Sequence, residues 1–302
     1  MCYRNILSLF AILSLVFGAT VAEADEVRIK PAGLTLNAQL SMADGKSLKD
    51  GAVMLVHGTL AHNGMDTIKN LSDVLNERGF NTLAINLSLG MDDRHGMYDC
   101  KVAHRHKHLD AVDEITAWFD WLKQKGAGDI VLFGHSRGGN QVTRFATEKG
   151  HASLTRLVLL APATWNQEAS AKGFEKSHAR PLTAALADAQ ARIAAGKGGM
   201  LMPGTGLLYC PGADATAESV VSYYKPDPRF DTPSILSELK VPTLVVAGGK
   251  DTVVKGLPER IKPMADGKRL HFGLVDDADH FFLDLYAEDV ADLMEEFLSP
   301  DS

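Results

Sequence analysis

Beyond residue 24 the sequence lacks any segment that is long and apolar enough to cross a bilayer. It also lacks internal repeats, low-complexity tracts and an excess of positive charge, since the formal net charge at pH 7 is -7. A negative net charge makes nucleic acid a poor candidate partner. What remains is an ordinary globular composition, 45% hydrophobic and 23% charged, in a chain of 302 residues that can bury one large core or two modest ones.

The first 24 residues have the layout of a signal peptide. One basic residue, Arg4, precedes a mainly apolar stretch from Ile6 to Ala19, and an Ala-x-Ala pattern ends at Ala24. The apolar stretch is shorter than the roughly 20 residues that a membrane-spanning helix needs, so we expect cleavage after Ala24 rather than a membrane anchor. No cysteine lies directly after that site, which argues against a lipid-modified N-terminus. We therefore expect an exported protein, periplasmic or secreted, without stable membrane insertion after cleavage.

Cysteine is scarce, and only Cys2, Cys100 and Cys210 are present. Removal of the signal would take Cys2 away and leave the other two as a pair in an oxidising compartment. A Cys100–Cys210 disulfide is therefore one hypothesis, and two unrelated buried thiols are the alternative. A thiol count on denatured protein, with and without reductant, distinguishes the two.

Five short, continuous apolar runs are typical of strands that are buried on both faces. They are Ala52–Val56, Thr82–Ile85, Ile130–Phe133, Leu157–Leu160 and Thr243–Val246. Helical patterns lie between and after them, and Val27–Met42 alternates as one or two antiparallel strands would. Because strand and helix alternate, we predict an α/β fold with a mainly parallel central sheet flanked by helices.

The alternation stops between residues 164 and 230. An Ala-rich amphipathic pattern from Leu182 to Ile193 leads there into a glycine-rich stretch. Long insertions in compact domains often form lids. We predict a core formed by residues 25–163 and 231–302, with a cap inserted at 164–230; a plain connection without function is the alternative.

Ser136 lies in the segment Gly134-His135-Ser136-Arg137-Gly138, directly after one predicted strand and before a helical pattern. A strand, a sharp turn and a helix hold a serine in a strained conformation, and glycines two residues on either side avoid clashes with neighbouring backbone. The turn places the hydroxyl at a helix N-terminus, where developing negative charge is favoured. We predict Ser136 as a nucleophile and the Arg137 backbone N–H as one oxyanion donor.

A second loop is expected to complete the oxyanion hole. The strand ending at Val56 runs into His57-Gly58-Thr59-Leu60, and the glycine lets backbone N–H groups face a bound carbonyl oxygen. Thr59 is the predicted second donor, with Leu60 as the alternative. We interpret His57 as a structural residue of this loop, because a histidine this early would reverse the expected order of nucleophile, acid and base.

An acid and a base follow the last two predicted strands. Asp251 comes just past a buried strand, and His280 follows the next one, so the order is Ser136, Asp251, His280. The chemistry needs His280 to take the serine proton and return it to the leaving group, while Asp251 fixes the imidazole tautomer. A helix cap is the alternative role for Asp251. The competing side chains are Asp276, Asp277 and Asp279 for the acid and His271 for the base.

These motifs resemble the landmarks of the α/β-hydrolase superfamily, and the resemblance spans nearly the whole chain after residue 24. The matching segments are His57-Gly58, Gly134-His135-Ser136-Arg137-Gly138-Gly139, Gly248-Gly249-Lys250-Asp251 and Asp279-His280-Phe281-Phe282. The resemblance implies the α/β-hydrolase fold and a serine nucleophile, but the superfamily includes esterases, lipases, amidases and peptidases. We expect a metal-independent serine hydrolase without a cofactor, acting on a small-molecule or acyl substrate through an acyl-enzyme, with carboxylester hydrolysis as the first expectation. An amidase or peptidase with the same triad is one alternative, and a non-catalytic binding protein that keeps the fold is another.

Histidine is concentrated before the helix that is expected from Leu109, with His104, His106 and His108 at alternate positions. In a strand the three would share one face, and in a helix His104 and His108 would be neighbours, so either geometry pairs two imidazoles. Two imidazoles can bind zinc or copper, and a basic loop can bind a substrate anion. We favour a different interpretation, in which the segment is a solvated basic loop that binds neither a metal nor an anion.

Overall fold

The computed structural model describes residues 24–299. The signal peptide predicted at residues 1–24 lies, except for its last residue, outside the described part. Among residues 24–299, no helix has both the length and the apolar character that crossing a bilayer would require.

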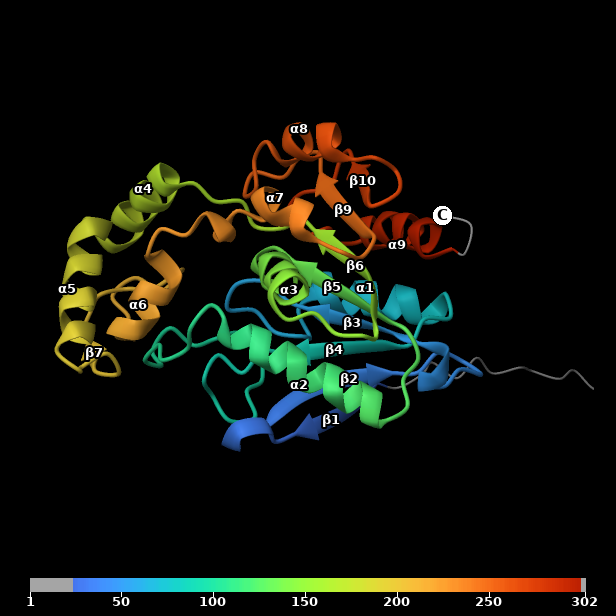
Figure 1. Cartoon of the computed structure of the whole chain (residues 1–302), viewed down its shortest axis with the longest axis horizontal. Coiled ribbons are helices and arrows are strands. Elements are labelled where there is room, and N and C mark those ends of the chain that lie inside the picture. Colours follow the sequence, from blue (N-terminus) through green and yellow to red (C-terminus); the bar gives the residue numbers. More distant parts are fainter. Residues whose placement is uncertain (1–23, 300–302) are drawn as a thin grey trace, which may run out of the picture.

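A twisted sheet forms the centre of the molecule (Figure 1). Within residues 24–299 it has eight strands, in the spatial order β1 (Asp25–Ile29), β2 (Leu36–Ser41), β4 (Thr82–Asn86), β3 (Ala52–Val56), β5 (Ile130–His135), β6 (Leu154–Leu160), β9 (Thr243–Gly248) and β10 (Leu270–Val275). The pairs β1–β2 and β2–β4 are antiparallel, and every other neighbouring pair is parallel. The predicted α/β fold with a mainly parallel sheet is confirmed.

Helices cover both faces of the sheet (Figure 1). They are α1 (Asp66–Glu77), α2 (Asp110–Gln124), α3 (Arg137–Glu148) and α9 (Tyr286–Leu298), with the shorter α7 (Thr232–Ile235) and α8 (Leu257–Ile261) near β9. The crossover through α1 runs from β3 toward the β1 edge, whereas those through α2 and α3 run the other way. Because such crossovers are right-handed, α1 lies on one face, with α9 packed against it, and the contacting pair α2 and α3 lies on the other.

The sequence pattern explains these elements. Every residue of β3 and of β4 is buried, because helices lie on both sides of the central strands. In α1, Ile68, Leu71 and Leu75 recur three and four residues apart and are fully buried, and Gly79, with φ 87°, follows the helix end. Replacing Leu75 by alanine would cost about 2–5 kcal/mol of unfolding free energy.

A lobe beside the sheet is built mainly from the segment predicted as a cap (Figure 1). It contains α4 (Gln167–His178), α5 (Leu182–Ala194), β7 (Leu201–Met202), β8 (Ala215–Thr216) and α6 (Ala217–Tyr224). These elements have apolar clusters of their own, in which Ala189, Met202 and Val220 are buried. The division into a core of residues 25–163 and 231–302 and a cap of residues 164–230 stays a prediction.

Short 3-10 helices complete the described part of the chain. They are η1 (Pro31–Gly33), η2 (Leu48–Asp50), η3 (Pro228–Phe230), η4 (Leu236–Glu238) and η5 (Lys262–Met264).

Candidate active site

Ser136 lies on a sharp turn between the end of β5 and the first residue of α3, Arg137. Its backbone has φ 55° and ψ -120°, which is strained for a residue with a side chain. The glycines make this turn possible, because a Cβ on Gly134 would lie 2.6 Å from Gly138 O and one on Gly138 would lie 2.7 Å from Val56 O. The local structure is the strand, turn and helix that a nucleophile elbow requires.

The structure brings Ser136, His280 and Asp251 into one hydrogen-bonded chain. His280 Nε2 lies 2.9 Å from Ser136 Oγ, and His280 Nδ1 lies 2.7 Å from Asp251 Oδ2. Ser136 and His280 are 8% and 5% exposed, so little water competes for these contacts. With Nδ1–H donating to the carboxylate, Nε2 keeps the lone pair that can accept a proton from the serine hydroxyl. The catalytic roles of these residues stay predictions.

Asp251 uses its two carboxylate oxygens for different tasks. Oδ1 accepts from the backbone N–H groups of Val253 at 2.6 Å and Val254 at 3.0 Å, while Oδ2 accepts from His280. Burial acts to raise the pKa of Asp251, but hydrogen bonds from His280 and from Val254 N–H outweigh it and hold the pKa below its ordinary value. Asp251 caps no helix, because the next one, α8, begins at Leu257 with Gly256 as its N-cap, and the two N–H contacts orient the carboxylate instead.

His135 supports the candidate base through the main chain. Its Nε2–H donates to the carbonyl oxygen of His280 at 2.9 Å, and the two ring centroids are 5.0 Å apart. Burial and the neighbouring His280 lower the pKa of His135 to about 4, so this ring is neutral at pH 7. Sequence reasoning missed this contact, because it joins residues 145 positions apart; the only signal was the place of His135 inside the elbow motif.

Asp277, Asp279 and His271, three of the competing side chains, contact other groups. Asp277 pairs with Lys250 at 2.7 Å, Asp279 accepts from a backbone N–H two residues later, and His271 lies on β10 with its ring toward a backbone carbonyl. The carboxylates of Asp276, Asp277 and Asp279 are all exposed. Asp251 is the carboxylate that contacts the imidazole of His280.

His57 is a buried part of the loop after β3. Its Nδ1–H donates to Gly58 O at 2.9 Å, and its Nε2 accepts from Leu87 N–H at 3.1 Å. Burial and the nearby guanidinium of Arg94 lower the pKa of His57 to about 3. A neutral ring with both nitrogens engaged in this way holds the loop in place, which agrees with the structural role predicted for it.

The predicted oxyanion donors lie on two neighbouring loops. Within residues 24–299, the backbone N–H groups of Thr59, Leu60 and Arg137 donate to no other group, so all three are available. The Nε–H of Arg137 donates to Thr59 Oγ1 at 2.9 Å, and this bond joins the two preferred residues. Leu60, with φ 55°, accepts from Tyr98 N–H at 3.0 Å through its carbonyl. The oxyanion roles stay predictions.

The interpretation of the histidine segment as a solvated loop is wrong. His104, His106 and His108 are at most 1% exposed. The cap covers them, because His104 pairs with β8 through its main chain and His106 Nδ1 lies 2.7 Å from the hydroxyl of Tyr223 on α6. Burial lowers the pKa of His104 to about 4 and those of His106 and His108 to about 3, so the rings are neutral.

The same three rings do not converge on a metal position. His104 Nδ1 lies 3.0 Å from His106 Nε2, while His108 Nε2–H donates to Asn140 Oδ1 at 3.0 Å. In the described part of the chain, the group of three residues with ligand atoms close enough for an ion lies elsewhere, at Glu26, Asp93 and His95. There Arg28 pairs with both carboxylates, so the site already holds a cation of the chain itself.

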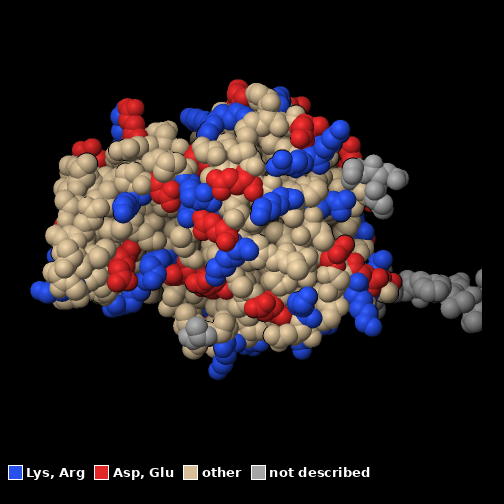
Figure 2. Space-filling view, viewed as in Figure 1, with Lys and Arg blue, Asp and Glu red and all other residues tan. Residues whose placement is uncertain are grey.

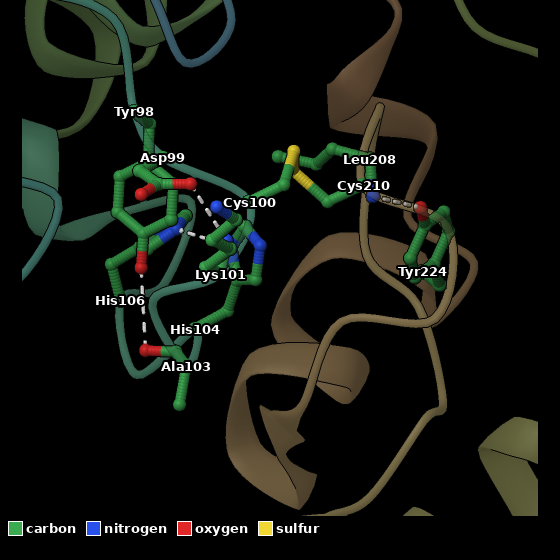
Figure 3. The surroundings of a disulfide bond; sticks show 10 residues. All are labelled: Tyr98, Asp99, Cys100, Lys101, Ala103, His104, His106, Leu208, Cys210 and Tyr224. Carbon is green, nitrogen blue, oxygen red and sulfur yellow. Dashed lines mark hydrogen bonds between the residues drawn. A yellow bond between two sulfur atoms is a disulfide. The ribbon is translucent and has the colours of Figure 1, made fainter.

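A disulfide joins Cys100 and Cys210, as one of the two sequence hypotheses proposed (Figure 3). It links the loop that carries the buried histidines to the cap. Cys210 is fully buried and packs in one cluster with Leu60 and Tyr98, whose ring stacks on His104 at 4.7 Å. The bridge therefore ties the cap to the loop that contacts the candidate oxyanion hole.

The cavities near the site differ in their lining. A groove of about 320 Å³ lies beside the candidate base and is lined by residues that include His62, Met65, Asp66 and Phe281. A larger cavity of about 850 Å³ is lined mainly by residues of β2 and α1. Its lining includes none of Ser136, His280 and Asp251. Of these two cavities, the groove is the one whose lining includes Phe281, the residue after His280.

The sheet order, the elbow at the end of β5 and the loops at the carboxyl ends of the strands define an α/β-hydrolase fold. The sequence matches the model of the alpha/beta hydrolase family over residues 53–293. The chain therefore belongs to the alpha/beta hydrolase family and is a hydrolase of that family. No curated protein matches its sequence significantly.

Several solved structures share this fold. Est1E from Butyrivibrio proteoclasticus has a TM-score of 0.61 and 18% identity, over 90% of this chain and 98% of that one. The esterase PF2001 of Pyrococcus furiosus has a TM-score of 0.59 and 17% identity, over 92% and 90%. A monoacylglycerol lipase of Paleococcus ferrophilus has a TM-score of 0.57 and 17% identity, over 87% and 98%. At these identities the likeness shows the fold alone.

Proposed function

We propose that this protein is an exported serine esterase that cleaves carboxylic esters through an acyl-enzyme on Ser136. The observation that carries the proposal is the buried chain from Ser136 Oγ through His280 to the charged carboxylate of Asp251. A serine hydroxyl is a weak nucleophile until an adjacent base removes its proton. Here His280 is the adjacent base, and its hydrogen bond to Asp251 holds it in the required tautomer.

In the first half of the reaction, Ser136 Oγ attacks the ester carbonyl carbon while its proton passes to His280 Nε2. The carbonyl oxygen becomes an oxyanion, which the backbone N–H groups of Thr59 and Arg137 stabilise. Asp251 stabilises the charged imidazole. His280 then gives the proton to the leaving alkoxide oxygen, the ester C–O bond breaks, and the acyl group stays on Ser136.

In the second half, water takes the place of the alcohol. His280 accepts a proton from the water, whose oxygen attacks the acyl carbonyl carbon. The bond to Ser136 Oγ breaks, His280 returns the proton to that oxygen, and a carboxylic acid is released. No metal or cofactor is required for either half.

Esters are proposed ahead of amides because the relatives with this fold include Est1E, a Pyrococcus esterase and a monoacylglycerol lipase. An amidase would use the same three residues but would have to protonate a poorer leaving group. Turnover of amide substrates and not of matched esters would contradict the proposal.

Export is proposed from the layout of residues 1–24. Expression of the full chain in a Gram-negative host, followed by N-terminal sequencing of the periplasmic protein, should give Asp25 as the first residue. Protein that stays in the cytoplasm and keeps Met1 would contradict export and leave the proposed chemistry untouched.

The chemistry is tested by labelling with a fluorophosphonate probe, which reacts with activated serines. Wild-type protein should be labelled at Ser136 and should hydrolyse 4-nitrophenyl esters. Ser136→Ala should lose both properties, whereas Ser237→Ala, at an exposed serine, should keep them. Folded wild-type protein that is neither labelled nor active on esters of any acyl length would refute the proposal.

A further inference from the structure

The side chain of Arg137 lies where the candidate oxyanion hole meets the cap. Its Nε–H donates to Thr59 Oγ1 at 2.9 Å, and its guanidinium carbon lies 5.4 Å from the centroid of the Tyr223 ring on α6. The side chain is only partly exposed. The residue directly after the candidate nucleophile thus places a cation beside the candidate oxyanion loop.

This cation has no carboxylate partner in the described part of the chain. No Asp or Glu oxygen of residues 24–299 lies within 4.0 Å of it, and its one side-chain hydrogen bond uses Nε, which leaves both Nη atoms as donors. Burial raises the pKa of Tyr223, and two nearby carboxyl groups, those of Asp110 and Glu114, help to raise it, but both accept hydrogen bonds from other residues. Asp110 accepts from Lys107 N–H at 2.7 Å, and Glu114 accepts from Ser88 N–H at 2.8 Å.

The groups around Tyr223 do not compensate the charge. His106 and His108 pack edge-on against the Tyr223 ring at 5.4 and 5.8 Å. Burial is the main cause that lowers the pKa of each histidine, and the positive charge of Arg137 lowers it further. A neutral, buried wall on one side strengthens the attraction of a half-buried guanidinium for an anion, because less water screens it.

The part of the site near His280 has another character. The leaving oxygen must lie against His280 Nε2, which donates its proton. The groove beside His280 is lined by Asp66 and Phe281, and no Lys or Arg lines it. A negative charge in this groove would therefore face a carboxylate, whereas one next to Thr59 can reach Arg137.

Surface charge does not provide this discrimination. On the face shown in Figure 2, Lys and Arg side chains alternate with Asp and Glu side chains. Attraction of an anionic substrate would depend on the local cation and not on a wide positive surface.

We propose that Arg137 is a specificity residue, and that the preferred substrate is an ester whose acyl part carries a carboxylate, paired with the free Nη atoms. The inference rests on the proposed ester hydrolysis at Ser136. A guanidinium offers a planar pair of donors that matches a carboxylate, and such charge-assisted bonds are among the strongest hydrogen bonds in proteins. The same residue would serve the reaction twice, through its backbone N–H and through its side chain.

The test compares two esters that differ only in charge, mono-4-nitrophenyl adipate and 4-nitrophenyl hexanoate, after subtraction of the spontaneous rate. The quantity measured is the ratio of their kcat/KM values. In wild-type protein the ratio should favour the anionic ester, and in Arg137→Gln it should fall about tenfold or more. Arg137→Lys, which keeps the charge but loses the planar donor pair, should give an intermediate ratio.

Arg105→Gln is the matched control. It removes the same charge from an exposed side chain on the neighbouring loop, and the ratio should stay as in wild-type protein. A residue that only latches the cap to Thr59 would change both rates in Arg137→Gln by the same factor, so an unchanged ratio would overturn the inference. A wild-type preference for the hexanoate would overturn it as well.

A second pair places the charge on the alcohol part, as the hexanoate esters of 4-hydroxybenzoate and of phenol. A preference for the anionic ester in this pair alone would overturn the acyl-side assignment. Hydrolysis of neutral esters without any charge preference would refute this inference and leave the proposed function intact. Failure to hydrolyse any ester would refute the proposed function itself.

Discussion

Replacing Asp251 by asparagine tests the assignment of the acid most directly. Asp251 Oδ1 already accepts from two backbone N–H groups, so the amide oxygen of asparagine would take that place. The amide NH2 group would then replace Oδ2, 2.7 Å from His280 Nδ1. A donor at this point forces Nδ1 to carry the lone pair and Nε2 to carry the proton. The shape of the site is kept, but His280 Nε2 cannot accept a proton from Ser136.

The expected loss is about 10⁴-fold in kcat, the size found when a triad carboxylate is replaced by its amide, and it corresponds to about 5.5 kcal/mol of transition-state stabilisation. Steady-state hydrolysis of a 4-nitrophenyl ester at pH 7.5 measures it, with thermal unfolding to show that the variant is folded. Asp277→Asn, which changes an exposed carboxylate paired with Lys250, is the control and should stay within about twofold of wild type. If folded Asp251→Asn kept a tenth or more of the wild-type kcat, the acid would have to be another residue.

Three further outcomes are expected. Cys100→Ser with Cys210→Ser should lower the free energy of unfolding by about 2–4 kcal/mol in urea titrations and also reduce kcat, because the bridge ties the cap to the oxyanion loop; wild-type stability would refute this. Gly138→Ala should abolish fluorophosphonate labelling, since its Cβ would meet backbone oxygens under 3 Å away; normal labelling would contradict the elbow. His106 and His108, whose pKa values burial lowers to about 3, take up protons below about pH 6.5 mainly in the unfolded chain, so each should cost up to about 1.4 kcal/mol of stability per pH unit as the pH falls. Urea midpoints at pH 7.5, 6.5 and 5.5 measure that slope, and a flat profile would show that the rings are accessible.

Much of the fold could be predicted because its signals are local. The five apolar runs became β3, β4, β5, β6 and β9, since strands buried on both faces need no alternation. The elbow at Ser136 could be placed because a strand, two glycines and a helix are contiguous in the chain. Asp251 and His280 could be selected because each follows a strand of a parallel sheet, and the carboxyl ends of such strands meet at one edge.

The histidine segment could not be predicted in the same way. His104, His106 and His108 alternate with Arg105 and Lys107, a pattern typical of a solvated loop. Their burial depends on contacts with cap residues more than 100 positions away, including Tyr223. No local pattern reports whether another part of the chain will cover a loop.

The sequence by itself determined the α/β class, the strand that presents Ser136 and the chain order of the three side chains, because these follow from hydrophobic periodicity and from the stereochemistry of glycine. Only the tertiary structure decided which carboxylate contacts His280, that His135 holds the backbone of the base, and that Arg137 stands beside Thr59 and Tyr223 without a carboxylate partner among the described residues. Each of these contacts joins residues far apart in the chain, so each depends on how the cap and the loops pack over the sheet.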